Sequence, residues 1–144
     1  MTSRPTANVS AARWIKLDDV AAVDSSAILA VFFQEPGGEI VAPILQGALL
    51  STVNLAEVHT RMIDRGAQSQ QAWSWIEGLQ CEICFFTDEQ ARVAAELKPI
   101  TRPFGLSLGD RACLALATCR KATVYTTDRA WKNLPLDLRI EVIR

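Results

Sequence analysis

The chain has 144 residues, of which 49% are hydrophobic and 22% charged, so its composition is that of one ordinary globular domain and not of a disordered segment. Its net charge of −1 provides no overall attraction to nucleic acid or to an anionic membrane, so a polyanionic partner would need a local basic patch or metal ions. No apolar run approaches the ~20 residues that span a bilayer, and residues 1–18 lack the apolar centre of a secretory signal. We therefore expect a cytoplasmic protein with an N-terminal extension over 1–18 and one domain over 19–144.

Apolar periodicity and turn residues predict strands that alternate with helices. The predicted strands are residues 20–23, 48–52, 81–86, 123–126 and 139–143. The predicted helices are residues 26–33, 39–47, 54–65, 69–79, 87–97, 107–119 and 128–134. Residues 98–106 contain two prolines and a glycine and are predicted to form a loop. This alternation predicts an α/β fold with a central parallel sheet and helices on both of its faces.

Local spacing supports two narrower predictions. In the second predicted helix, Ile40, Ile44 and Leu45 are expected to face the core. At the start of the fifth, Thr87 and Gln90 have the spacing of a capping box, in which each side chain bonds the other residue's backbone N–H.

Four acidic residues follow predicted strands or lie in the first turns of the helices after them: Asp24, Glu57, Asp110 and Asp128. Each alone has an ordinary explanation, because acids near helix starts accept otherwise unpaired N–H groups and oppose the positive end of the helix dipole. Asn54 with Glu57, and Ser107 with Asp110, also have the spacing of capping boxes.

Taken together, the four acids also predict a shared site at one edge of the sheet. The carboxyl ends of parallel strands meet at one rim of an open α/β sheet, where ligands bind. Carboxylates gathered there repel one another and raise one another's pKa unless a cation compensates. Hard oxygen ligands suit Mg²⁺ or Mn²⁺, and such an ion can activate a water for attack on a phosphodiester. The pattern therefore indicates metal-dependent phosphodiester hydrolysis.

Other chemistries find little support in the sequence. The only histidine, His59, excludes a multi-histidine zinc site and is interpreted as a surface or packing residue. Cys81 and Cys84 lie on a predicted strand, where residues three apart point to opposite faces, so we expect free thiols. No glycine-rich phosphate-binding motif occurs. The tryptophans are interpreted as packing groups, although Trp131 follows Asp128 near the predicted rim.

Four stretches of the chain, in this order, resemble those of PIN-domain ribonucleases, and most closely those of the VapC toxins of bacterial toxin–antitoxin pairs. The stretches are V-D-S-S-A-I-L at 23–29, N-L-A-E-V at 54–58, S-L-G-D-R-A-C-L-A-L-A at 107–117 and Y-T-T-D-R-A-W at 125–131. The resemblance implies a three-layer α/β/α fold whose five-stranded parallel sheet has the order 3-2-1-4-5. It also implies an endoribonuclease that depends on Mg²⁺ or Mn²⁺.

The family's motif positions assign roles to residues of this chain. The implied catalytic acids are Asp24, Glu57, Asp110 and Asp128. The metal ligands among them are expected to be Asp24, Asp110 and Asp128. The implied supporting residues are Asn54, Ser107 and Thr126. Candidates for a basic rim that holds RNA are Arg61, Arg111 and Arg129. Each arginine also has the ordinary interpretation of an exposed partner to a nearby acid.

The resemblance also implies partners, because such toxins usually dimerise and are neutralised by a small cognate antitoxin. We therefore expect an RNA substrate, an antitoxin partner and a homodimer, with no membrane attachment. An aspartyl-phosphate enzyme is a poorer alternative, because a dehalogenase-like site would need a second Asp where Ser26 stands. A PIN-like module that binds RNA or protein without catalysis stays open.

Overall fold

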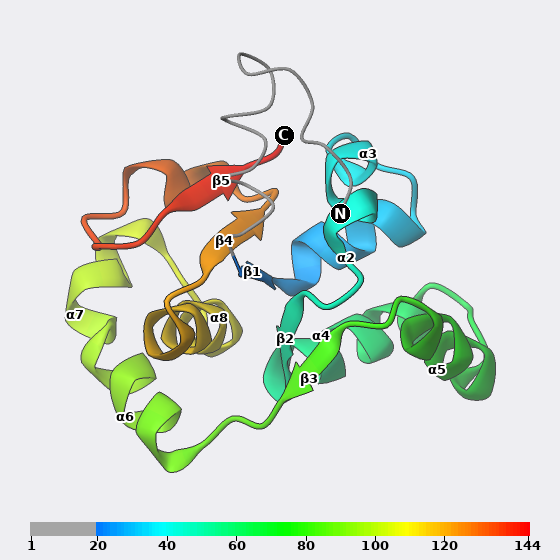
Figure 1. Ribbon diagram of the computed structural model, residues 1–144, viewed down its shortest axis with the longest axis horizontal. Helices are drawn as coiled ribbons and strands as arrows, with labels where there is room; N and C mark the ends of the chain where they lie inside the picture. Colours follow the sequence, from blue (N-terminus) through cyan, green and yellow to red (C-terminus); the bar gives the residue numbers. More distant parts are fainter. Residues whose placement is uncertain (1–19) are drawn as a thin grey trace, which may run out of the picture.

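The computed structural model describes residues 20–144 (Figure 1). The predicted extension over residues 1–18 lies outside the described residues and stays a prediction. None of the helices that are described is long and apolar enough to cross a membrane.

The centre of the fold is a sheet of five parallel strands in the order β3-β2-β1-β4-β5. The strands are β1 (Ala21–Val23), β2 (Leu49–Ser51), β3 (Glu82–Cys84), β4 (Thr123–Thr126) and β5 (Ile140–Val142). In the register of the sheet, Ala22 pairs with Leu49 on one side and with Val124 on the other. The predicted topology is thus confirmed, and β1 lies in the middle with β2 and β4 beside it.

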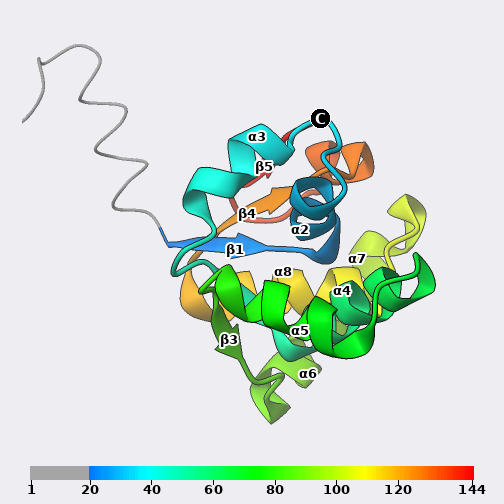
Figure 2. The ribbon, with the colours of Figure 1, turned by 90° about the vertical axis from the view of Figure 1, so that its right-hand side faces the viewer.

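Helices cover both faces of this sheet (Figures 1 and 2). The α-helices are α2 (Ser25–Phe32), α3 (Gly38–Val41), α4 (Thr52–Asp64), α5 (Ser69–Gly78), α6 (Asp88–Glu96), α7 (Lys98–Thr101) and α8 (Leu108–Arg120). The short 3₁₀ helices are η1 (Ala42–Ile44), η2 (Arg102–Phe104) and η3 (Arg129–Asn133). The three-layer α/β/α architecture agrees with the prediction.

Two hydrophobic cores lie on opposite faces of the sheet because side chains alternate along each strand. Ala22 and Leu49 face one core, which α8 supplies with a run of buried side chains. Val23 and Leu50 face the other, which α2 and α4 fill. Burial on both faces explains why β1 and β2 are apolar without an alternating polar pattern, as parallel strands usually are.

The structure corrects the prediction of one helix over residues 39–47. The segment is divided into α3 and η1, with Pro43 in the first turn of η1. Proline lacks the N–H that would continue an α-helix, so its place at the start of a new turn is the favourable one. Leu45 is buried as predicted and Ile44 is half-buried, but Ile40 is 52% exposed, so its predicted inward orientation is wrong.

The predicted loop over residues 98–106 is also wrong, because α7 and η2 occupy most of it. Pro99 and Pro103 each lie in the first turn of one of these short helices, where proline is tolerated. Gly105 then ends η2 with a φ of +71°, a left-handed conformation that glycine adopts without strain.

Only one of the two hydrogen bonds of the predicted capping box forms at the start of α6. Thr87 Oγ1 accepts a hydrogen bond from Gln90 N at 3.2 Å. The Gln90 side chain is buried, and its Oε1 has no hydrogen-bond partner among the described residues, so it does not return a bond to Thr87. Packing of α6 against the core has decided the direction of this side chain.

Candidate active site

Asp24 directly follows the central strand β1, and its side chain is 3% exposed. Its Oδ1 caps α2 by accepting a hydrogen bond from Ala27 N at 2.9 Å. Ser26 Oγ lies 2.8 Å from Oδ1 and 2.9 Å from Oδ2, and Thr126 Oγ1 donates to Oδ2 at 2.6 Å. Burial outweighs these hydrogen bonds and raises the pKa of Asp24 to about 6. The carboxylate is therefore held rigidly in a poorly solvated place.

Thr126 joins Asp24 to the next acid along the rim. It ends β4, the neighbour of β1, and its Oγ1 accepts a hydrogen bond from Asp128 N at 3.1 Å. The exposed Asp128 carboxylate accepts a hydrogen bond from Ala130 N at 2.9 Å and so caps η3. Asp128 is thus both a cap and a member of the rim.

Asp110 comes to the same place from the first turn of α8. It forms a complete capping box with Ser107, in which Ser107 N donates to Asp110 Oδ2 at 2.9 Å and Asp110 N donates to Ser107 Oγ at 3.2 Å. Partial burial raises the pKa of Asp110 in spite of these bonds, and the negative charges of Asp128 and Glu57 raise it further. Asp110 in turn raises the pKa of Asp24. Asp110 therefore lies within electrostatic reach of the other three predicted acids.

Glu57 completes the group from the second turn of α4. Asn54 Nδ2 donates to Glu57 Oε1 at 2.9 Å and to the carbonyl oxygen of Gly109, on α8, at 3.1 Å. Asn54 is 1% exposed, so this link between α4 and α8 is buried. The Glu57 carboxylate lies against the backbone of Gly109, where a Cβ would come within 2.6 Å of Glu57 Cδ.

The capping interpretation is right for one pair of residues and wrong for the other. Ser107 with Asp110 is a capping box as predicted. The box predicted for Asn54 with Glu57 is wrong, because α4 begins earlier, at Thr52, and Ser51 is its N-cap. Asn54 therefore lies inside the helix, where its side chain is free to reach across to α8.

Two residues with a place in this site were not identified from the sequence. Ser26 holds both oxygens of Asp24 and also accepts a hydrogen bond from Thr127 N at 3.0 Å, which ties the start of α2 to the end of β4. Gly109 provides the room for Glu57. A glycine in the first turn of a helix costs about 1 kcal/mol relative to alanine, so its presence there was the available signal.

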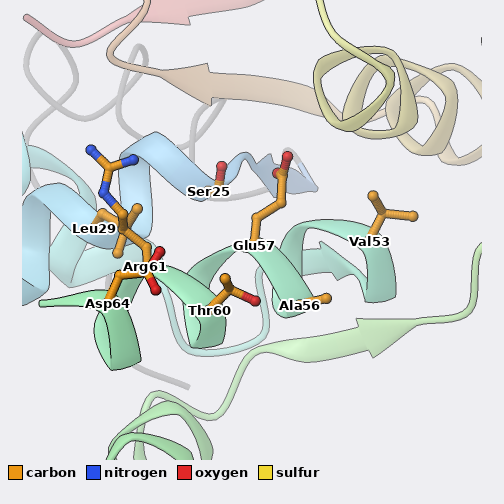
Figure 3. A pocket seen from close by; sticks show the side chains of 8 residues that line it. All are labelled: Ser25, Leu29, Val53, Ala56, Glu57, Thr60, Arg61 and Asp64. Carbon is orange, nitrogen blue, oxygen red and sulfur yellow. The ribbon is translucent and has the colours of Figure 1, made fainter. Parts of the chain in front are cut away.

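A pocket of about 650 Å³ lies between α2 and α4, and we name it the Glu57 pocket (Figure 3). It is lined by Ser25, Leu29, Val53, Ala56, Glu57, Thr60, Arg61 and Asp64. In Figure 3, Glu57 and Arg61 project from the same side of α4 toward α2. Arg61 therefore lies beside Glu57 in the lining of this pocket.

The other two predicted arginines differ in their positions. Arg129 lines a second pocket together with Asp128 and lies at the rim. Arg111 is half-buried, and its Nη1 donates to the carbonyl oxygen of Ala94, on α6, at 2.8 Å. The structure thus places the Arg111 guanidinium against α6 and does not bring it to the rim.

His59 and Trp131 have the packing roles predicted for them, whereas Trp14 lies outside the described residues. His59 Nε2 lies 3.0 Å from the carbonyl oxygen of Ser69, and its ring centre lies 5.5 Å from that of Trp73, so it joins α4 to α5. Trp131 is fully buried in a core and cannot stack on an exposed base. Cys81 and Cys84 are free thiols, and burial raises the pKa of both.

The donors at the rim fit a hard cation that keeps part of its water shell. Over residues 20–144, no three Asp, Glu, His or Cys side chains are gathered closely enough to make a complete protein cage. Mg²⁺ commonly uses only one or two carboxylates and completes its octahedron with waters and substrate phosphate. Burial is the main cause that raises the pKa of Asp24 and of Asp110, and neighbouring carboxylates raise both pKa values further, so a cation held there would stabilise the ionised acids.

Comparisons with known proteins agree with this geometry. The family model of the PIN domain matches residues 21–136. No curated protein matches the sequence significantly.

Several solved structures share the fold. The VapC20 toxin of Mycobacterium tuberculosis, described as cleaving the sarcin–ricin loop, is 16% identical, with a TM-score of 0.67 over 83% of this chain and 98% of that chain. VapBC2 of Rickettsia felis, bound to a promoter DNA fragment, is 19% identical, with a TM-score of 0.65 over 85% and 97%. A toxin–antitoxin complex from Klebsiella pneumoniae is 16% identical, with a TM-score of 0.64 over 80% and 92%. Because the family model spans most of the chain and the fold agrees, this chain belongs to the PIN domain family.

Proposed function

We propose that this protein is a metal-dependent endoribonuclease and the toxin of a toxin–antitoxin pair. The observation that carries the proposal is that four separate elements bring four carboxylates toward one rim. The charge of Asp110 raises the pKa of Asp24, and the charges of Asp128 and Glu57 raise the pKa of Asp110. Caps alone need no common location, so mutual repulsion at one rim indicates a site built for a cation.

Of Asp24, Asp110 and Asp128, one or two would bind a Mg²⁺ or Mn²⁺ ion directly and the others would hold its waters. The ion would supply Lewis-acid stabilisation of the phosphodiester and a more acidic water. Thr126 and Ser26 fix the direction of the Asp24 carboxylate through their hydrogen bonds. Asn54 fixes Glu57, whose carboxylate is positioned to orient a water and accept its proton.

Metal dependence is the first expected result. Labelled RNA should be cleaved in the presence of Mg²⁺ or Mn²⁺, and cleavage should stop in excess EDTA and return when metal is restored. Gel analysis of the products measures both. An Asp110→Asn preparation purified in parallel controls for contaminating nucleases. Undiminished cleavage in EDTA would contradict the metal mechanism, and RNA binding without cleavage under any metal would favour the non-catalytic PIN-like module.

The proposed biological setting is a cytoplasmic toxin that forms a homodimer and is bound by a small antitoxin. The support is the fold shared with the toxin–antitoxin complex from Klebsiella pneumoniae and with VapBC2 of Rickettsia felis. In that setting the antitoxin would mask the acidic rim, and its release would expose the rim to RNA.

Asp128 and Asp88 form a matched pair for testing the position of the site. Both follow strands, but β4 is the neighbour of β1, whereas β3 is two strand spacings of ~4.8 Å away at the edge. Asp88→Ala should cost about 0.5–1 kcal/mol through the helix dipole and leave cleavage nearly unchanged. Asp128→Ala should cost about 1 kcal/mol through loss of the cap at Ala130, and cleavage should fall roughly 100-fold.

Urea unfolding and initial cleavage rates of the two variants measure these effects. If Asp88→Ala is the inactive variant and Asp128→Ala the active one, the site is not at the central rim.

A further inference from the structure

A chain of pockets extends away from the acidic rim. Next to the Glu57 pocket lies one of about 330 Å³, which we name the Arg65 pocket. It is lined by Ser25, Ser26, Leu29, Phe33, Glu35, Arg61, Arg65, Thr127 and Arg144. It shares Ser25, Leu29 and Arg61 with the Glu57 pocket, and it shares Ser26, Thr127 and Arg144 with the pocket that holds Asp128. The three pockets therefore adjoin one another, and two of the four acids, Glu57 and Asp128, belong to their lining.

The Arg65 pocket is basic although the whole chain carries a net charge of −1, because three arginines and a single acid, Glu35, line it. Arg61, Arg65 and Arg144 converge on the Arg65 pocket from separate points of the chain. Arg144 Nη2 lies 3.5 Å from Glu35 Oε1, but both side chains are more than a third exposed, so this ion pair holds Arg144 only weakly. Charge complementarity therefore favours an anionic group, such as an RNA phosphate, as the occupant of the Arg65 pocket.

One of these arginines, Arg65, lies over the aromatic ring of Phe33. The guanidinium carbon of Arg65 lies 4.1 Å from the centre of the Phe33 ring. Arg65 itself is exposed, so a ligand can reach its side chain. A planar guanidinium supported from behind by an aromatic ring offers a flat surface on which a nucleobase can stack.

We propose that Arg65, supported by Phe33, is the binding subsite for an unpaired base of the substrate next to the bond that is cut. Arg61 and Arg144 would hold the phosphates on either side of that base. A base inside a duplex is stacked on both faces and cannot enter a pocket, so the subsite selects single-stranded RNA. This inference rests on the proposed ribonuclease function, since it places the base beside the acidic rim.

The test measures RNA binding by fluorescence anisotropy in an Asp24→Asn background, where the RNA is not cut. Phe33→Leu and Arg65→Gln should each weaken binding of a labelled single strand roughly 10-fold, because stacking on the subsite is lost. The matched control is Arg92→Gln, an exposed arginine of α6 that lines none of these pockets, and it should change binding less than about 2-fold. Melting temperatures establish that each variant is folded.

Abasic substitutions in the RNA separate stacking from a general structural effect. At one position, loss of the base should weaken binding to the Asp24→Asn protein roughly 10-fold but scarcely change binding to the same protein carrying Phe33→Leu. Arg65→Lys keeps the positive charge but removes the planar guanidinium, so the affinity of this variant should also scarcely change when the base is lost. Additive losses at every position, or equal binding of a duplex of the same sequence, would overturn the inference.

Cleavage by the protein with Asp24 intact distinguishes the two proposals. If the protein cleaves RNA but substitution of Phe33 or Arg65 does not change its affinity for RNA, the subsite is rejected and the ribonuclease proposal is retained. Position-specific binding without any cleavage would reject the ribonuclease proposal and retain the subsite.

Discussion

Asp24→Asn is expected to reduce RNA cleavage about 1,000-fold and, at the same time, to stabilise the metal-free protein at neutral pH. The loss of cleavage follows from removal of a carboxylate that would hold the metal, since metal stabilisation of the transition state is worth several kcal/mol. The gain in stability follows from burial, because an ionised carboxylate at 3% exposure costs free energy that a neutral amide does not.

The stability effect has a defined pH window. Folding raises the pKa of Asp24 from 3.8 to about 6, so the folded protein binds this proton more tightly than the unfolded chain does. Below about pH 4 the group is protonated in both states and costs nothing. The cost grows between pH 4 and pH 6 and is complete above pH 6, where it amounts to about 3 kcal/mol at most at 1.36 kcal/mol per pH unit.

Urea unfolding in EDTA at several pH values measures this window. The gain from Asp24→Asn should be largest above pH 6 and disappear below pH 4. Asp88→Asn is the matched control, because Asp88 is exposed in the first turn of α6 and should show no such gain. If Asp24→Asn instead lowers the stability at pH 7.5, the carboxylate is chiefly the cap that bonds Ala27 N, and the proposed role at the metal loses its electrostatic support.

Gly109→Ala should produce the second large effect, a fall of about 100-fold in cleavage without unfolding. The new Cβ would lie 2.6 Å from Glu57 Cδ, so the Glu57 carboxylate must move and its hydrogen bond from Asn54 must lengthen or break. A displacement of about 1 Å in a catalytic constellation can cost roughly 100-fold in rate. The helix itself should tolerate the change, since alanine is favoured over glycine in a helix by about 1 kcal/mol.

Two further variants isolate the steric cause. Gly78→Ala is the matched control, because Gly78 ends α5 and a Cβ there would meet nothing within 4 Å, so cleavage should not change. Glu57→Asp added to Gly109→Ala shortens the acid by one methylene group and should recover stability lost to crowding. Initial rates and urea unfolding measure both. Full activity of Gly109→Ala would show that the position of the Glu57 carboxylate is not critical.

The sequence by itself determined the class of fold and showed which acids follow its strands or begin the next helices. Alternation of apolar strands with helices requires a parallel sheet, and acids at strand ends and helix starts must come to one rim when those strands are neighbours. The complete box at Ser107 and Asp110 was also predictable, because it depends only on residues three apart.

The tertiary structure decided the contacts between distant segments. Asn54 has the local spacing of a cap, yet it bonds Gly109, 55 residues away, because Ser51 already caps α4 and the two helices pack together. Arg111 follows an acid of the rim, yet its guanidinium bonds Ala94 of α6. Local spacing specifies which hydrogen bonds are possible within a turn, whereas packing of whole elements decides which side chains meet across the core, and that packing sets the geometry of this site.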